Sequence, residues 1–251
     1  MKNTLNLRFN KLFFGALCLL IIITIAGTVG EYRNLAQFIR PLYIPVFLIF
    51  FFVAKKTIKV PLILCLLYFF LGDVSSMFIN DYIFVKTSSI MYFLSYLCLI
   101  GFIAPKFKLE GFNKFIAFYL VAVVLINIYF LYTICSILKT IMPDSLEVFL
   151  FGIKSISLIV LLFIPFGVYL NSENRVSILF LLMALSFIFS NFLNYVSQYY
   201  VYHWSFSMLD KVFHIIGLYY LFTYIYGYNK LVAHRTQAHR DENVSANNVL
   251  A

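Results

Sequence analysis

Apolar residues dominate eight stretches of the chain, and short polar segments separate them. Each stretch approaches the roughly 20 residues that an α-helix needs to cross a bilayer. The pattern therefore predicts eight membrane-spanning helices, at about residues 12–30, 38–54, 60–79, 84–104, 115–138, 148–170, 176–199 and 209–229. The second is the shortest and contains prolines, which neighbouring helices must accommodate. The expected fold class is an all-α polytopic membrane bundle.

Composition supports one membrane domain. Hydrophobic residues make up 63% of the 251 residues and charged residues only 12%, with a mean hydropathy of +0.93. Soluble chains are closer to half apolar. No polar stretch is long enough to form a second folded domain, so we expect a single transmembrane domain over residues 1–229. The polar segment 230–251 is expected to be a disordered tail.

The distribution of basic residues predicts the orientation in the membrane. The net charge is +9, but Lys and Arg lie in short segments between apolar runs, which does not favour a nucleic-acid partner. With the N-terminus inside, 13 of the 19 Lys and Arg residues fall on the inner side. This bias predicts cytoplasmic termini and a multi-pass protein of the cell membrane, specifically a bacterial inner membrane.

The sequence gives no sign of a metal or cofactor site. The four cysteines lie singly within apolar runs, and none has CxxC spacing or a nearby histidine. The glycine-rich, GxSxG and HExxH motifs of soluble enzymes are absent from the sequence. We therefore expect no metal and no cofactor, and the sequence leaves the oligomeric state open.

The segment FFLGDVSS, residues 69–76, places a carboxylate within an apolar run. Asp73 follows Val60 by 13 residues, which puts it roughly 20 Å from the inner surface at about 1.5 Å per residue. A charged side chain within the bilayer costs a few kcal/mol and usually marks a functional site. Asp73 is therefore the first candidate for chemistry.

Other polar side chains are predicted at a similar depth. Asn191 follows Val176 by 15 residues and belongs to a polar stripe along the seventh predicted helix. Lipid cannot satisfy such groups, so they are expected to face one another around a pocket that opens toward the outer leaflet. The candidates for substrate binding in this pocket are Arg40, Tyr92, Tyr96, Asn191, Asn194 and His214.

Each candidate also has a purely structural interpretation. Gly72 and the serines after Asp73 allow helices to pack closely, and Asn194 can form an interhelical hydrogen bond. Arg40 can extend its side chain to the lipid headgroups. His214 can be an ordinary residue near a helix end.

Four segments together resemble the YhhN-like, lysoplasmalogenase family of eight-helix membrane proteins. They are FIRPLYIPVFL at 38–48, LLYFFLGDVSSMF at 66–78, SFIFSNFL at 186–193 and GLYYLFTYIY at 217–226. The resemblance spans roughly residues 35–228. Its most specific elements are Pro41-Leu42 and Leu71-Gly72-Asp73.

The resemblance implies hydrolysis of the vinyl ether bond of a lysoplasmalogen, with release of a fatty aldehyde. Two intramembrane aspartates are the candidates for this chemistry in the family; the first corresponds to Asp73 and the second falls on Asn191. The reaction begins with protonation of a carbon atom, and a buried carboxylic acid is a suitable donor. In this scheme Asp73 is the acid, Asn191 and Asn194 hold water, and Arg40 meets the phosphate.

Three functions follow as hypotheses. The first is a lysoplasmalogenase-like hydrolase of a lysolipid. The second is a non-catalytic protein of the same fold that binds or senses a single-chain lipid. The third is a small-solute or proton transporter, which the nearly apolar segments 60–68 and 176–185 argue against because a transporter needs a polar path to both faces.

Overall fold

The computed structural model describes residues 2–30, 38–53, 59–78, 82–107, 114–142, 144–172, 175–200 and 203–249, with side chains for most of those between 11 and 227. These residues are almost entirely helical and contain no strand, as predicted. The eight α-helices are α1 (Lys2–Val29), α3 (Tyr43–Val53), α4 (Val60–Ser75), α5 (Tyr82–Ile103), α6 (Lys114–Ile141), α7 (Ser145–Ser172), α8 (Arg175–Tyr195) and α9 (Trp204–Val249).

Short 3-10 or π-helical turns adjoin three of these helices. The 3-10 turn η1 (Arg40–Leu42) leads into α3, and η2 (Ala104–Lys106) follows α5. The π-helical turn η3 (Val196–Tyr200) continues α8. Each of the eight predicted apolar stretches thus coincides with one helix, because continuous apolar sequence of this length has no other way to satisfy its backbone within lipid.

Within the described residues, five helices are long and apolar enough to cross a membrane, namely α1, α5, α6, α7 and α8, whereas α3 and α4 are apolar but shorter. The outer surface of the bundle is apolar as well. On α6, for example, Phe118, Tyr129 and Tyr132 are each at least 70% exposed. A water-soluble protein rarely exposes so continuous an apolar surface. The chain is therefore compatible with a multi-pass membrane protein.

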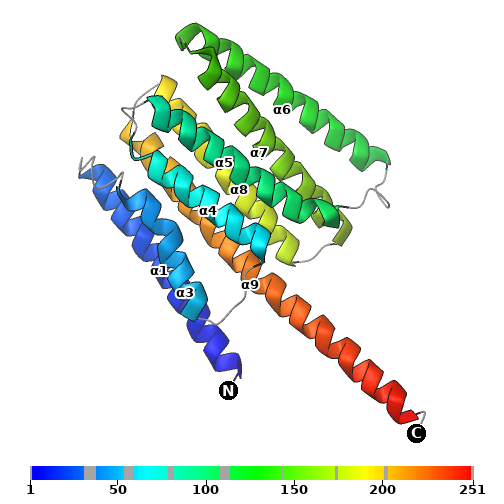
Figure 1. Ribbon diagram of the computed structural model, residues 1–251. Helices are drawn as coiled ribbons and strands as arrows, with labels where there is room; N and C mark the ends of the chain where they lie inside the picture. Colours follow the sequence, from blue (N-terminus) through cyan, green and yellow to red (C-terminus); the bar gives the residue numbers. More distant parts are fainter. Residues whose placement is uncertain are drawn as a thin grey trace.

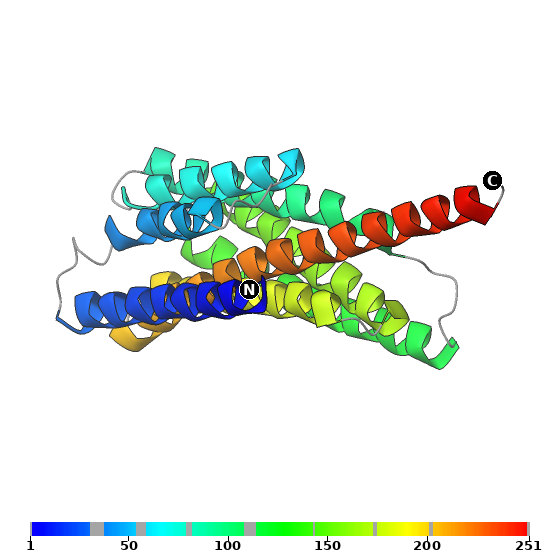
Figure 2. The same cartoon turned by 90° about the horizontal axis from the view of Figure 1, so that it is seen from below.

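The centre of the bundle is formed by α4, α5, α7, α8 and α9 (Figure 1). Helices α4 and α5 pack together, as do α8 and α9, and α7 contacts both α5 and α8. On one side α1 and α3 cover α9, and on the other α6 covers α7. Both termini lie toward the same end of the bundle, and the C-terminal part of α9 projects beyond it (Figures 1 and 2).

Two element ends differ from the sequence predictions. Helix α9 continues to Val249, so the segment expected to be a tail from residue 230 is helical in its backbone. Helix α4 stops at Ser75 rather than near residue 79. Its end has a local cause, because Ser76 Oγ donates a hydrogen bond to the backbone carbonyl of Asp73 at 2.7 Å and so competes with a further helical turn.

Candidate functional site

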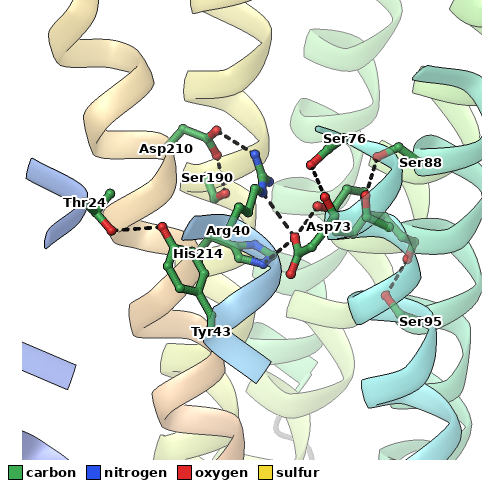
Figure 3. A network of polar contacts seen from close by, with 12 residues as sticks. Thr24, Arg40, Tyr43, Asp73, Ser76, Ser88, Ser95, Ser190, Asp210 and His214 are labelled. Atoms are coloured by element: carbon green, nitrogen blue, oxygen red, sulfur yellow. Dashed lines mark hydrogen bonds and ion pairs between the residues drawn. The ribbon is translucent and has the colours of Figure 1, made fainter. Parts of the chain in front are cut away.

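Asp73 lies in the last turn of α4 and is fully buried. Its Oδ1 atom accepts hydrogen bonds from Tyr92 Oη at 2.5 Å and from Arg40 Nε at 3.2 Å (Figure 3). The C-terminal end of a helix carries a partial negative charge, so an aspartate there is stable only with such donors. Asp73 Oδ2 is buried and has no hydrogen-bond partner among the described residues.

The packing of α4 against α5 brings Tyr92 to Asp73. A Cβ atom added to Gly72 would lie 3.1–3.3 Å from three ring carbons of Tyr92, so the ring occupies the space that a larger residue would fill. Ser88 Oγ, one turn earlier in α5, donates to the Gly72 carbonyl at 3.0 Å. The small-residue face predicted from the sequence therefore also positions the phenol that holds Asp73.

Arg40 joins two carboxylates. Its Nε atom faces Asp73, and its Nη1 atom donates to Asp210 Oδ2 at 3.3 Å (Figure 3). Only 14% of the Arg40 side chain is exposed, so these ion pairs are largely shielded from solvent. Arg40 was expected to meet a phosphate group, but in the structure two of its nitrogens are engaged by carboxylates from α4 and α9.

Asp210 was not among the residues predicted for the site. It is buried near the start of α9, where Ser190 Oγ of α8 donates to its Oδ1 at 2.5 Å. The predicted span began at residue 209 and made Asp210 look like a helix-end residue, whereas α9 begins at Trp204. Asp210 therefore lies more than one turn inside the helix and supplies a second buried carboxylate.

His214 follows Asp210 by one helical turn and is also buried. Its Nε2 atom lies 3.2 Å from Asp73 Oδ1, but the angle does not satisfy a hydrogen bond. The neighbouring Tyr43 hydroxyl is fixed from α1: Thr24 Oγ1 donates to the Leu20 carbonyl, so Tyr43 Oη donates to Thr24 Oγ1 at 3.0 Å (Figure 3). His214 thus lies between the Asp73 carboxylate and a fixed aromatic wall.

Aromatic rings close the cluster on the side facing the middle of the bundle. Phe69 precedes Asp73 by one turn of α4, and Phe187 precedes Ser190 by one turn of α8. Their rings stack with centroids 4.9 Å apart and lie 6.1 and 5.6 Å from the His214 ring. The charged groups are therefore confined to one end of the bundle.

A small, partly open cavity lies beside the charged cluster. Its volume is about 20 Å³, enough for about one water molecule. Nine side chains line it: Arg40, Tyr92, Tyr96, Lys154, Ser190, Asn191, Asn194, Asp210 and His214. The six candidates for substrate binding are all among them.

Asp73, the residue predicted to be catalytic, does not line the cavity, because Arg40, Tyr92 and His214 surround it. The cavity is also far too small to enclose a lysolipid. The nearest polar contact of Asn191 is Ser155, whose Oγ lies 3.5 Å from its Nδ2.

Lys154 is the second residue that the sequence interpretation missed. It lies in α7 nine residues after Ser145, is 8% exposed and lines the cavity. The depth argument applied to Asp73 would have identified it, because a lysine this far inside an apolar run is equally costly. The span predicted at 148–170 placed it near a helix start, whereas α7 begins at Ser145.

These features define an all-helical bundle of membrane-protein type, with a buried cluster of charged residues at one end. Among the described residues, no group of three or more His, Cys, Asp or Glu side chains is placed to hold a metal ion. Comparisons of the chain with protein-family models, curated proteins and solved structures find no match.

Proposed function

We propose that the protein is a membrane-embedded hydrolase that cleaves the vinyl ether bond of a lysolipid. The observation that supports this most strongly is the pair of buried carboxylates, Asp73 and Asp210, which share the Arg40 guanidinium beside a cavity of water size. Paired carboxylates are the usual means of cleaving acetal-type bonds through an oxocarbenium ion.

Asp210 answers the main difficulty of the family resemblance. The expected second aspartate falls on Asn191, which carries no charge. Asp210 comes from the adjacent helix α9 and lines the same cavity as Asn191. In the proposed site the second carboxylate is therefore supplied by α9 rather than α8.

His214 is the proton donor in this scheme, since it lines the cavity whereas Asp73 does not. One ring nitrogen lies 3.2 Å from Asp73 Oδ1, and this proximity orients the imidazole. The other nitrogen gives its proton to the β-carbon of the vinyl ether. Asp73 then acts as a positioning residue behind His214.

Protonation of the β-carbon leaves a positive charge shared by the α-carbon and the ether oxygen. The Asp210 carboxylate, fixed by Ser190 and Arg40, stabilises this charge without having to reorganise. A water molecule in the cavity attacks the α-carbon and loses a proton to His214. The resulting hemiacetal then breaks its bond to the glycerol oxygen, which gives the aldehyde and the alcohol.

The topology proposed for this activity has eight spanning helices with both termini in the cytoplasm. It is supported by the charge bias of the sequence and by termini at the same end of the bundle (Figure 1). The charged cluster then lies in the outer half of the membrane. The substrate enters from the outer leaflet and places its ether bond at the mouth of the cavity.

Aldehyde release from a lysoplasmalogen by the purified full-length protein tests the proposal. His214→Gln is expected to lower the rate by about 10²–10⁴-fold, the usual contribution of a general acid. Asp210→Asn is expected to lower it by about 10²–10³-fold. Asp73→Asn should also abolish most activity. His203→Gln and Asp144→Asn, which alter the same residue types outside the cluster, are the controls. Wild-type protein without activity, or variants with unchanged rates, would contradict the proposal.

A non-catalytic lipid-binding protein is the second candidate. The enclosure of Asp73 by Arg40, Tyr92 and His214 favours it, because a binder needs no carboxylate at the bond. It predicts that a single-chain lipid copurifies with the protein but is not hydrolysed.

A further inference from the structure

Lys154 is a buried ammonium group that faces the cavity without a counter-ion. Within the described part of the chain, no carboxylate lies within 4 Å of its Nζ atom. The Nζ atom lies over the Phe151 ring, 5.8 Å from its centroid. A lysine in an apolar environment is normally paired. The side chain therefore retains donors for a group that enters from the cavity.

Asp210, the carboxylate that lines the cavity, already accepts hydrogen bonds at both oxygens. Asp210 uses Oδ1 to accept from Ser190 and Oδ2 to accept from Arg40. Arg40 and Lys154 line the same cavity, so each basic side chain lies within range of the other's charge. A bound anion would relieve this repulsion and give Lys154 its missing partner.

The charges that line the cavity favour an anion. Apart from His214, they comprise two cations, Arg40 and Lys154, and one carboxylate, Asp210. Because Arg40 is already paired with Asp210 and with Asp73 behind the cavity, Lys154 is the cation that remains for an incoming anion. The carboxamides of Asn191 and Asn194, one turn apart on α8, add neutral donors to the same wall. Lys is a common phosphate ligand because its three donors adapt to the position of the anion.

A lipid phosphate can approach the cavity from the ends of the two shortest helices. The 3-10 turn before α3 begins at Arg40, and α4 ends two residues after Asp73. The cluster is therefore level with these ends, although α7 and α9 extend beyond it, and a lipid headgroup can reach this level beside the two short helices. The cavity is partly open, and the flexible side chain of Lys154 can meet a phosphate at its mouth.

We propose that Lys154, together with Asn191 and Asn194, is the binding site for a phosphate group at the mouth of the cavity. This assignment rests on the proposed function for its substrate class, a single-chain lipid with a phosphate headgroup. It moves phosphate recognition from Arg40 to α7 and α8, and leaves Arg40 to hold the two aspartates.

Binding measured by native mass spectrometry on the full-length protein tests the site separately from catalysis. The probes are an ester-linked lysophospholipid without a vinyl ether, a monoacylglycerol of the same chain length, a fatty acid and inorganic phosphate. Lys154→Met should weaken lysophospholipid binding at least tenfold, as expected for loss of a charged hydrogen bond. Binding of the monoacylglycerol should not change. Lys154→Arg should retain most of the affinity, and Lys211→Met is the matched control.

The outcomes separate the two proposals. Headgroup-dependent binding that is lost in Lys154→Met supports the phosphate site even if no aldehyde is ever released. Binding that is unchanged in Lys154→Met, or that weakens equally for both lipids, overturns the site even if hydrolysis is observed. Fatty acid binding as tight as that of lysophospholipid also overturns the assignment to phosphate. Competition by inorganic phosphate would show that the phosphate group alone is sufficient for binding. Retained lysophospholipid binding without competition by inorganic phosphate would identify the lipid headgroup as the source.

Discussion

Arg40 Nη1 lies 3.3 Å from Asp210 Oδ2, which joins two residues 170 positions apart in the chain. The same guanidinium holds Asp73 through Nε. These contacts connect the start of α3, the end of α4 and the first turns of α9. The stability of this end of the bundle therefore depends on one shared cation.

Removing Arg40 is expected to be strongly destabilising. Arg40→Met leaves two buried carboxylates without their cation, and loss of one partner of a buried ion pair typically costs about 3–5 kcal/mol. The triple variant Arg40→Met, Asp73→Asn, Asp210→Asn removes the uncompensated charges and should recover most of that loss. Unfolding of the purified protein in a mild detergent by titration with a denaturing one measures both. A triple variant no more stable than Arg40→Met would show that the charges are not the cause.

Gly72→Ala should displace the Tyr92 ring. The new methyl group would lie 3.1 Å from the nearest ring carbon, and overpacking of this kind costs about 1–3 kcal/mol. The higher helix propensity of alanine offsets about 1 kcal/mol of this. Gly101→Ala in α5 is the control, because a Cβ there has no neighbour within 4 Å. Thermal unfolding should therefore show a lower Tm for Gly72→Ala and an equal or higher Tm for Gly101→Ala.

Tyr92→Phe removes a hydrogen bond to a buried carboxylate. Such bonds contribute about 1.5–3 kcal/mol, so this variant should be less stable by about that amount. Tyr96→Phe tests the specificity of the effect, since Tyr96 is equally buried but its hydroxyl has no hydrogen bond within the described residues. Equal losses in the two variants, measured by denaturant titration, would contradict a special role for the Tyr92 hydroxyl.

The contact between Asp144, which precedes α7, and Lys86 of α5 predicts a pH dependence. The hydrogen bond from Lys86 holds the pKa of Asp144 below its ordinary value of 3.8. A carboxyl group with a lowered pKa in the folded state stabilises the protein above the unfolded value and loses this contribution as the pH falls through the folded value. Asp144→Asn should thus be less stable than wild type near neutral pH but not in strong acid. A stability difference that persists at the lowest pH would contradict this assignment.

The sequence predicted the helices well because hydropathy acts locally. Each apolar run is long enough to dictate a helix by itself, including the proline-containing run that forms η1 and α3. The six residues expected around one pocket line a single cavity. Depth along a helix follows from the residue count, so residues of α5, α8 and α9 at the same level can be recognised from the sequence.

The lateral order of the helices was not predictable in the same way. Hydropathy does not say which helix lies beside which, so the place of Asp73 behind Arg40, Tyr92 and His214 was not foreseen. Asp210 and Lys154 were not among the predicted residues. Both belong to helices that begin before the predicted span, at Trp204 and Ser145, and so lie deeper than that span implies.

The short length of α4 affects the lipid beside it. Its 16 residues give about 24 Å at 1.5 Å per residue, against about 30 Å of hydrocarbon in a typical bilayer. A bilayer adapts to such a mismatch by becoming thinner locally. The leaflet surface would then lie closer to the bilayer centre beside Asp73 and Arg40. A lipid at this place would have its headgroup level with Lys154.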